Sequence, residues 1–97
     1  MKLVKDKVPE IMRAEGKTPK THIAAVEEYK EYLLKKLEEE VAEVKRDLNE
    51  EELADVIEVV YALTELLKKS PADLENTRLR KLEKTGGFKK RIILENA

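Results

Sequence analysis

Apolar residues recur at helical spacing along the middle of the chain. From about residue 24 to 47 they follow one another at steps of three and four, at Val26, Tyr29, Leu33, Leu37, Val41, Val44 and Leu48. A second stretch, from about residue 50 to 69, carries apolar positions on most of its circumference, among them Val56, Ile57, Val59, Val60, Tyr61 and Leu63. This pattern predicts a second long helix, which should be the most buried one.

Capping and helix-stopping residues predict two further helices. Pro9 and Gly16 favour a short helix over residues 8–16. Ser70, Pro71 and Asp73 form an S-x-x-D capping pattern, which begins a third long helix that ends at the double glycine of residues 86 and 87.

The two ends of the chain have a different character. Residues 2–7 fit a short strand or an extended arm, and the β-favouring residues of 88–94 favour a short strand. The predicted fold is therefore all-α, an antiparallel helical bundle with short terminal strands, in one domain over residues 1–97.

Composition narrows the functional classes. Of the 97 residues 42% are charged, yet the 20 basic and 21 acidic side chains leave a net charge of only −1. This balance argues against a nucleic-acid coat or a membrane-surface protein. The chain has no cysteine, and it shows no membrane-length apolar run and no signal-peptide pattern, so we expect a cytoplasmic protein. Abundant Lys and Glu without Gln are typical of proteins from hot environments.

Acidic residues lie unusually close to the apolar faces of the two central helices. On a helical wheel Glu40 lies about 60° from Leu37, and Glu52 lies about 40° from Val56. An antiparallel hairpin that turns between the helices brings Glu43 level with Glu52 and Glu40 level with Asp55, because the midpoints of the two pairs coincide. Four carboxylates would then converge, and a hard divalent cation such as Mg²⁺ would relieve their repulsion.

A simpler interpretation of the same residues stays open. Glutamate favours helices, and a run of acidic residues is usually a solvated face. Nearby basic residues could pair with these acids one helical turn away, namely Lys35, Lys36, Lys45 and Arg46.

The acidic pattern also resembles a known family. The motif E-E-x-x-E at residues 39–43, followed by E-E-x-x-D at 51–55, is similar to that of the MazG-like all-α nucleoside triphosphate pyrophosphatases. The opening "KLVKDKVPEIM" and the ending "KTGGFKKRIIL" resemble a short, stand-alone subgroup described as house-cleaning pyrophosphatases. The resemblance implies that Mg²⁺, or Mn²⁺, is held by Glu40, Glu43, Glu52 and Asp55. Glu39, beside the first pair, is a candidate either for supporting a metal ligand or for orienting water as a base. The implied reaction hydrolyses a nucleoside triphosphate between its α and β phosphates.

Substrate contacts and subunit contacts follow less directly. The basic residues Lys89, Lys90 and Arg91, with Lys5 and Lys7 next, are candidates for binding phosphate, although charge on an exposed edge strand would explain the first three equally well. His22 is expected to be a surface residue. Tyr29 and Tyr61 fit the core, a subunit interface or base stacking. The excess apolar surface of the second long helix predicts a homodimer or a higher homo-oligomer.

Two alternatives to this function remain. One is a helical interaction module without enzymatic activity, and the other is phosphoribosyl-ATP pyrophosphohydrolase of histidine biosynthesis.

Overall fold

The computed structural model describes residues 1–96 and shows four helices, so the all-α prediction is confirmed. They are α1 (Val8–Ala14), α2 (Val26–Arg46), α3 (Glu50–Leu66) and α4 (Pro71–Thr85). Each begins and ends within a few residues of its predicted limits. The second long helix stops earlier than expected, because Lys68 adopts a left-handed conformation with φ 61°.

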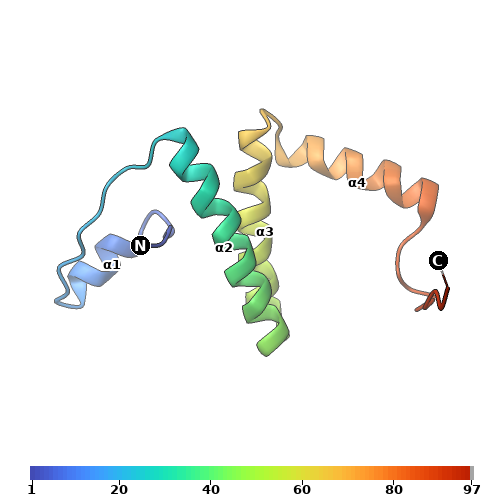
Figure 1. Ribbon diagram of the computed structural model, residues 1–97, viewed down its shortest axis with the longest axis horizontal. Coiled ribbons are helices and arrows are strands. Elements are labelled where there is room, and N and C mark those ends of the chain that lie inside the picture. The colour runs from blue at the N-terminus through green and yellow to red at the C-terminus, as the bar shows by residue number, and fades with distance from the viewer. Residues whose placement is uncertain (97) are drawn as a thin grey trace.

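The α2–α3 hairpin forms the centre of the molecule (Figure 1). Three residues, Asp47 to Asn49, connect the two helices, which then pack side by side along their length. The buried apolar core is small: Leu33 of α2 is 2% exposed and Val59 of α3 is 7% exposed. Helices α2 and α3 each contribute two buried residues, α2 from 21 positions and α3 from 17.

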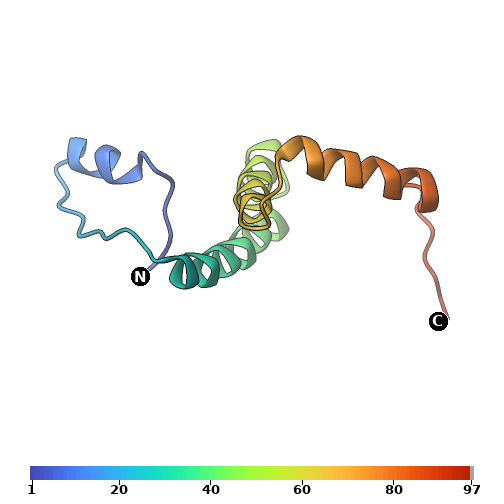
Figure 2. The ribbon, with the colours of Figure 1, turned by 90° about the horizontal axis from the view of Figure 1, so that it is seen from above.

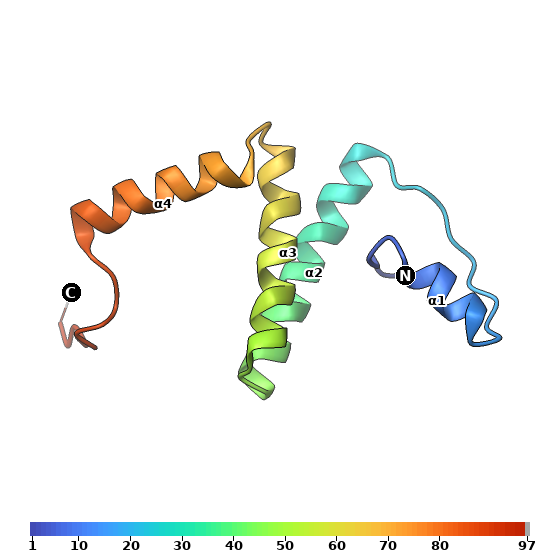
Figure 3. The same ribbon diagram turned by 180° about the vertical axis from the view of Figure 1, so that it is seen from behind.

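Helix α4 begins with the predicted cap. The Asp73 amide donates to the Ser70 hydroxyl at 3.1 Å, and the Ser70 amide donates to the Asp73 carboxylate at 2.9 Å. The helix ends at Gly86, whose φ of 80° suits glycine. From its start at the end of α3, α4 extends away from the hairpin (Figure 3), and none of its residues is buried.

Helix α1 lies on the opposite side of the hairpin from α4, as the view from above shows (Figure 2). Among residues 1–96 it packs against no other helix. The N-terminal segment before it, residues 1–6, runs back to the hairpin beside the first part of α2 (Figure 1).

The prediction of short terminal strands is wrong for the described residues, since neither residues 2–7 nor residues 88–94 form a strand. A strand needs a neighbour to pair its backbone groups, and neither segment has a strand partner within residues 1–96. Within residues 1–96, no helix has both the length and the apolar character required to cross a membrane.

Candidate metal centre

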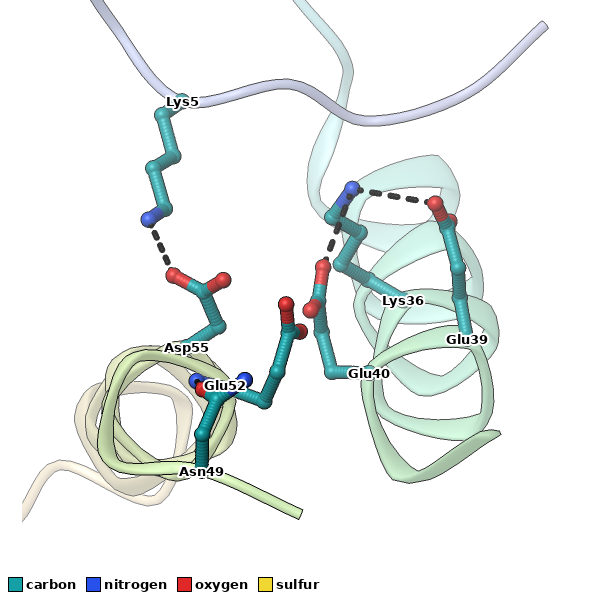
Figure 4. A network of polar contacts seen from close by, with 7 residues as sticks. All are labelled: Lys5, Lys36, Glu39, Glu40, Asn49, Glu52 and Asp55. Carbon is teal, nitrogen blue, oxygen red and sulfur yellow. Dashed lines mark hydrogen bonds and ion pairs between the residues drawn. The ribbon is translucent and has the colours of Figure 1, made fainter. Parts of the chain in front are cut away.

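Three carboxylates from α2 and α3 meet in the gap between these helices (Figure 4). Glu40, Glu52 and Asp55 each offer one oxygen, and the three oxygens lie within 4.8 Å of one another. Glu40 is buried at 8% exposure, while the other two residues are half-buried. Clustered carboxylate oxygens of this kind are the donor set that Mg²⁺ and Mn²⁺ prefer.

The start of α3 fixes two of these side chains. The Asn49 side chain caps the helix by accepting a hydrogen bond from the Glu52 amide at 2.9 Å. Asp55 follows Glu52 by three residues, so both lie on the same side of the helix. The unpaired amide groups at the beginning of a helix favour negative charge, which accounts in part for the acidic first turn of α3.

Two ammonium groups flank the three carboxylates. Lys5 reaches from the N-terminal segment to Asp55, with Nζ 2.6 Å from Oδ1 (Figure 4). Lys36, on α2, lies 3.4 Å from Glu40 and 3.5 Å from Glu39. The hydrogen bond to Asp55 raises the pKa of Lys5. The three carboxylates are thus flanked by two ammonium groups, which leaves an excess of negative charge.

Glu52 is the member of this group without a counterion among residues 1–96. Burial raises the pKa of the Glu52 carboxyl above its ordinary value, and the neighbouring charges of Glu43 and Asp55 raise it further. The charged form of Glu52 is therefore disfavoured in the fold, which is the situation that a bound divalent cation would reverse.

The other predicted carboxylates lie outside the group of three. Glu43 forms an ion pair with Arg46 on the same helix, although its charge still acts on Glu52. Glu39 is exposed, and its contact is with Lys36. The simpler interpretation by helical ion pairs is thus correct for Arg46 and for Lys36, whereas Lys35 pairs with Glu31.

The predicted phosphate-binding residues are widely separated. Lys5 lies at the carboxylates, while Lys7 is exposed at the start of α1 and has no ion pair in the described part of the chain. Lys89, Lys90 and Arg91 are exposed in the C-terminal segment beyond α4 (Figures 1 and 3), so the structure does not bring them to the carboxylates of their own chain.

Lys36 belongs to the candidate site, although its sequence position predicted only an ion pair on the helix surface. Its side chain is just 16% exposed, which is unusual for lysine. The available signal was its position one helical turn before Glu40 on the same face.

The chain matches no protein-family model. No curated protein and no solved structure matches it either.

Proposed function

We propose that this protein is a Mg²⁺-dependent nucleoside triphosphate pyrophosphohydrolase, which cleaves the α–β phosphoanhydride to release a nucleoside monophosphate and pyrophosphate. The observation that carries the proposal is the meeting of Glu40, Glu52 and Asp55 across the hairpin. The motifs at residues 39–43 and 51–55, which resemble those of the MazG-like pyrophosphatases, support the same conclusion. A house-cleaning role in the cytoplasm, acting on noncanonical nucleotides, belongs to this proposal.

The donor set fits Mg²⁺ or Mn²⁺. Three carboxylates would hold the ion, while Glu43 stays in its ion pair with Arg46 and adds negative charge near Glu52. A bound divalent cation would supply Lewis-acid stabilisation of negative charge on the phosphate oxygens.

In this proposal, side chains beside the carboxylates bind the phosphates and accept a proton. The ammonium groups of Lys5 and Lys36 flank the carboxylates and can donate hydrogen bonds to phosphate oxygens. Glu39 lies beside Lys36, and in this proposal it accepts a proton from the attacking water.

We also propose that the active form is a homodimer or a higher homo-oligomer. The radius of gyration is 17.2 Å, whereas a compact chain of this length has about 12–13 Å. Apolar side chains spaced one turn apart remain exposed on α3, namely Leu53, Ile57 and Tyr61, at 46%, 49% and 38%. A second copy that covers these side chains would remove the cost of their exposure.

A second copy would also give the C-terminal basic residues a role. Lys89, Lys90 and Arg91 lie away from their own carboxylates. In a dimer they could reach the carboxylates of the partner subunit and contact the phosphates there.

Exposed apolar stripes equally suit a helical interaction module without enzymatic activity, so the experiment must separate the two. Release of pyrophosphate should be measured with Mg²⁺ over a panel of canonical and noncanonical nucleoside triphosphates, with phosphoribosyl-ATP included. Turnover of phosphoribosyl-ATP alone would assign the protein to histidine biosynthesis. Absence of turnover, together with no Mg²⁺ or Mn²⁺ binding by calorimetry at millimolar metal, would favour the interaction module.

A matched pair of variants tests the carboxylates themselves. Glu52→Gln should reduce turnover by more than about a hundredfold, since loss of outer-shell partners alone costs 10–100-fold. Glu51→Gln, which alters the exposed neighbour, should leave turnover unchanged. Without metal, Glu52→Gln should raise the melting temperature because it removes an uncompensated charge, whereas Asp55→Asn should not, because it leaves Lys5 without its partner. Equal turnover in the two glutamine variants would exclude Glu52 as a ligand.

A further inference from the structure

A hollow of about 540 Å³ lies between the N-terminal segment and the beginning of α2. Residues 1–6 form one wall, residues 20–24 form the second, and Glu28, Tyr29 and Tyr32 of α2 form the third. Its volume falls within the range of small-molecule sites, about 300–1,000 Å³.

The lining of the hollow suits a planar ring with polar edges. Tyr29 and Tyr32 supply two aromatic side chains, and Leu3, Val4 and Ile23 add aliphatic surface. His22 and Glu28, whose side chains are 2.9 Å apart, supply polar groups that can donate and accept hydrogen bonds. Aromatic faces bind such rings by stacking, while polar neighbours select among ring edges.

Lys5 connects this hollow with the carboxylates. It lines the hollow, and its ammonium group is also 2.6 Å from Asp55. Figure 4 shows the side chain passing from the N-terminal segment to the carboxylate group. A ligand with its ring in the hollow would therefore place its attached phosphates toward Lys5 and the three carboxylates.

We infer that this hollow is the nucleobase subsite of the proposed nucleotide site, where the base stacks against Tyr32 and Tyr29 and the phosphates extend past Lys5. The inference rests on the proposed function for its substrate class. The remaining aromatic residues do not compete for this role, because Tyr61 lies on α3 and Phe88 lies in the C-terminal segment, and neither lines the hollow.

The test compares ligands with and without a base. Binding of the α,β-methylene analogues of ATP, GTP and UTP, and of inorganic tripolyphosphate, is measured by calorimetry with Mg²⁺. At least one analogue should bind the wild-type protein more tightly than tripolyphosphate does. Tyr32→Leu should weaken binding of that analogue by roughly fivefold or more, which is the lower end of the loss seen on removing a stacking ring. The same variant should leave the affinity for tripolyphosphate unchanged. Leu34→Ala is the control, since Leu34 lies on the same helix as Tyr32 but does not line the hollow, and it should change neither affinity.

A second measurement uses the wild-type chain alone, so it does not depend on how a variant folds. With the three tyrosine rings isotopically labelled, the analogue should shift the NMR signals of Tyr29 and Tyr32 but not that of Tyr61, and tripolyphosphate should shift none of them strongly.

The outcomes separate this inference from the proposed function. If tripolyphosphate binds and no analogue binds more tightly, or if the Tyr29 and Tyr32 signals stay in place, the hollow is not the base subsite and the phosphate site stands. Equal losses in Tyr32→Leu and Leu34→Ala would also overturn the inference. If neither tripolyphosphate nor any analogue binds, both the subsite and the proposed function fail.

Discussion

The α2–α3 hairpin and α4 have similar sequence patterns but differ in how much of their apolar surface is buried. Both parts consist of amphipathic helices rich in charged residues. Well-formed caps begin α3 at Asn49 and α4 at Ser70. The hairpin nevertheless buries Leu33, Val59 and Glu40, whereas α4 buries nothing. Capping and local ion pairs are thus enough to define a helix, but a core forms only where a second helix covers the apolar face.

This difference matters because α4 is near the length limit for an isolated helix. Helices shorter than about 12–15 residues are marginal in water without tertiary contacts, and α4 has 15 residues. Its capping box and the pair of Arg78 with Glu75 support it locally. Leu79 and Leu82 remain 46% and 42% exposed, and the dimer proposed above would cover them.

The largest expected effect concerns the core of the hairpin. Leu33→Ala should destabilise the protein by about 2–5 kcal/mol, because it removes a buried side chain and leaves a cavity. Leu79→Ala in α4 should cost far less in dilute solution, because that side chain is already 46% exposed. Denaturant unfolding of both variants checks the comparison, and equal losses at low protein concentration would show that α4 is covered within one chain.

The next effect concerns the exposed stripe on α3. Ile57→Glu should convert an oligomer to a monomer of 11.2 kDa, because a charge placed in the interface would be costly to desolvate. Ile23→Glu, which changes an isoleucine that is 97% exposed outside the helices, is the control. Light scattering measures the mass of each protein. A wild-type protein that is active as a monomer would contradict the proposed dimer.

A smaller effect is expected from the basic residues of the C-terminal segment. Replacing Lys89, Lys90 and Arg91 by Gln should weaken triphosphate binding and make it less dependent on salt, since screened charge attraction is lost. The control replaces three basic residues of α4 by Gln, namely Arg80, Lys81 and Lys84. If triphosphate binding depends on salt equally in both triple variants, the C-terminal segment does not contact the phosphates.

The smallest effect is the pH dependence of the α4 cap. The hydrogen bond from the Ser70 amide, followed by one from the Ser70 side chain, holds the pKa of Asp73 below its ordinary value. A lowered pKa in the folded state means that the stabilisation is present above the unfolded pKa and disappears as pH falls through the folded pKa. Circular dichroism should therefore show α4 losing helix content at acidic pH in the wild type, with a weaker acid response in Asp73→Asn. Glu83→Gln, altered on the same helix, should respond like the wild type.

Much of this structure followed from local pattern alone. The spacing of apolar residues placed α2 and α3, and the S-x-x-D pattern placed the start of α4, because helix formation and capping depend on neighbours within one or two turns. The same regularity made Glu40, Glu52 and Asp55 predictable as a cluster, since an antiparallel hairpin with a short turn has few possible registers.

Tertiary structure alone decided which distant charge reaches the carboxylates. The pair of Arg46 with Glu43 is local to α2. Lys5 is 50 positions away from Asp55, and no local rule connects residues at that separation. The terminal strands failed for the same reason, because a strand depends on an extended partner that only the folded chain can supply. Local free energies select the helices and place Lys36 beside Glu40, whereas contacts between distant segments depend on the whole arrangement of the chain, and such a contact brings Lys5 to the candidate site.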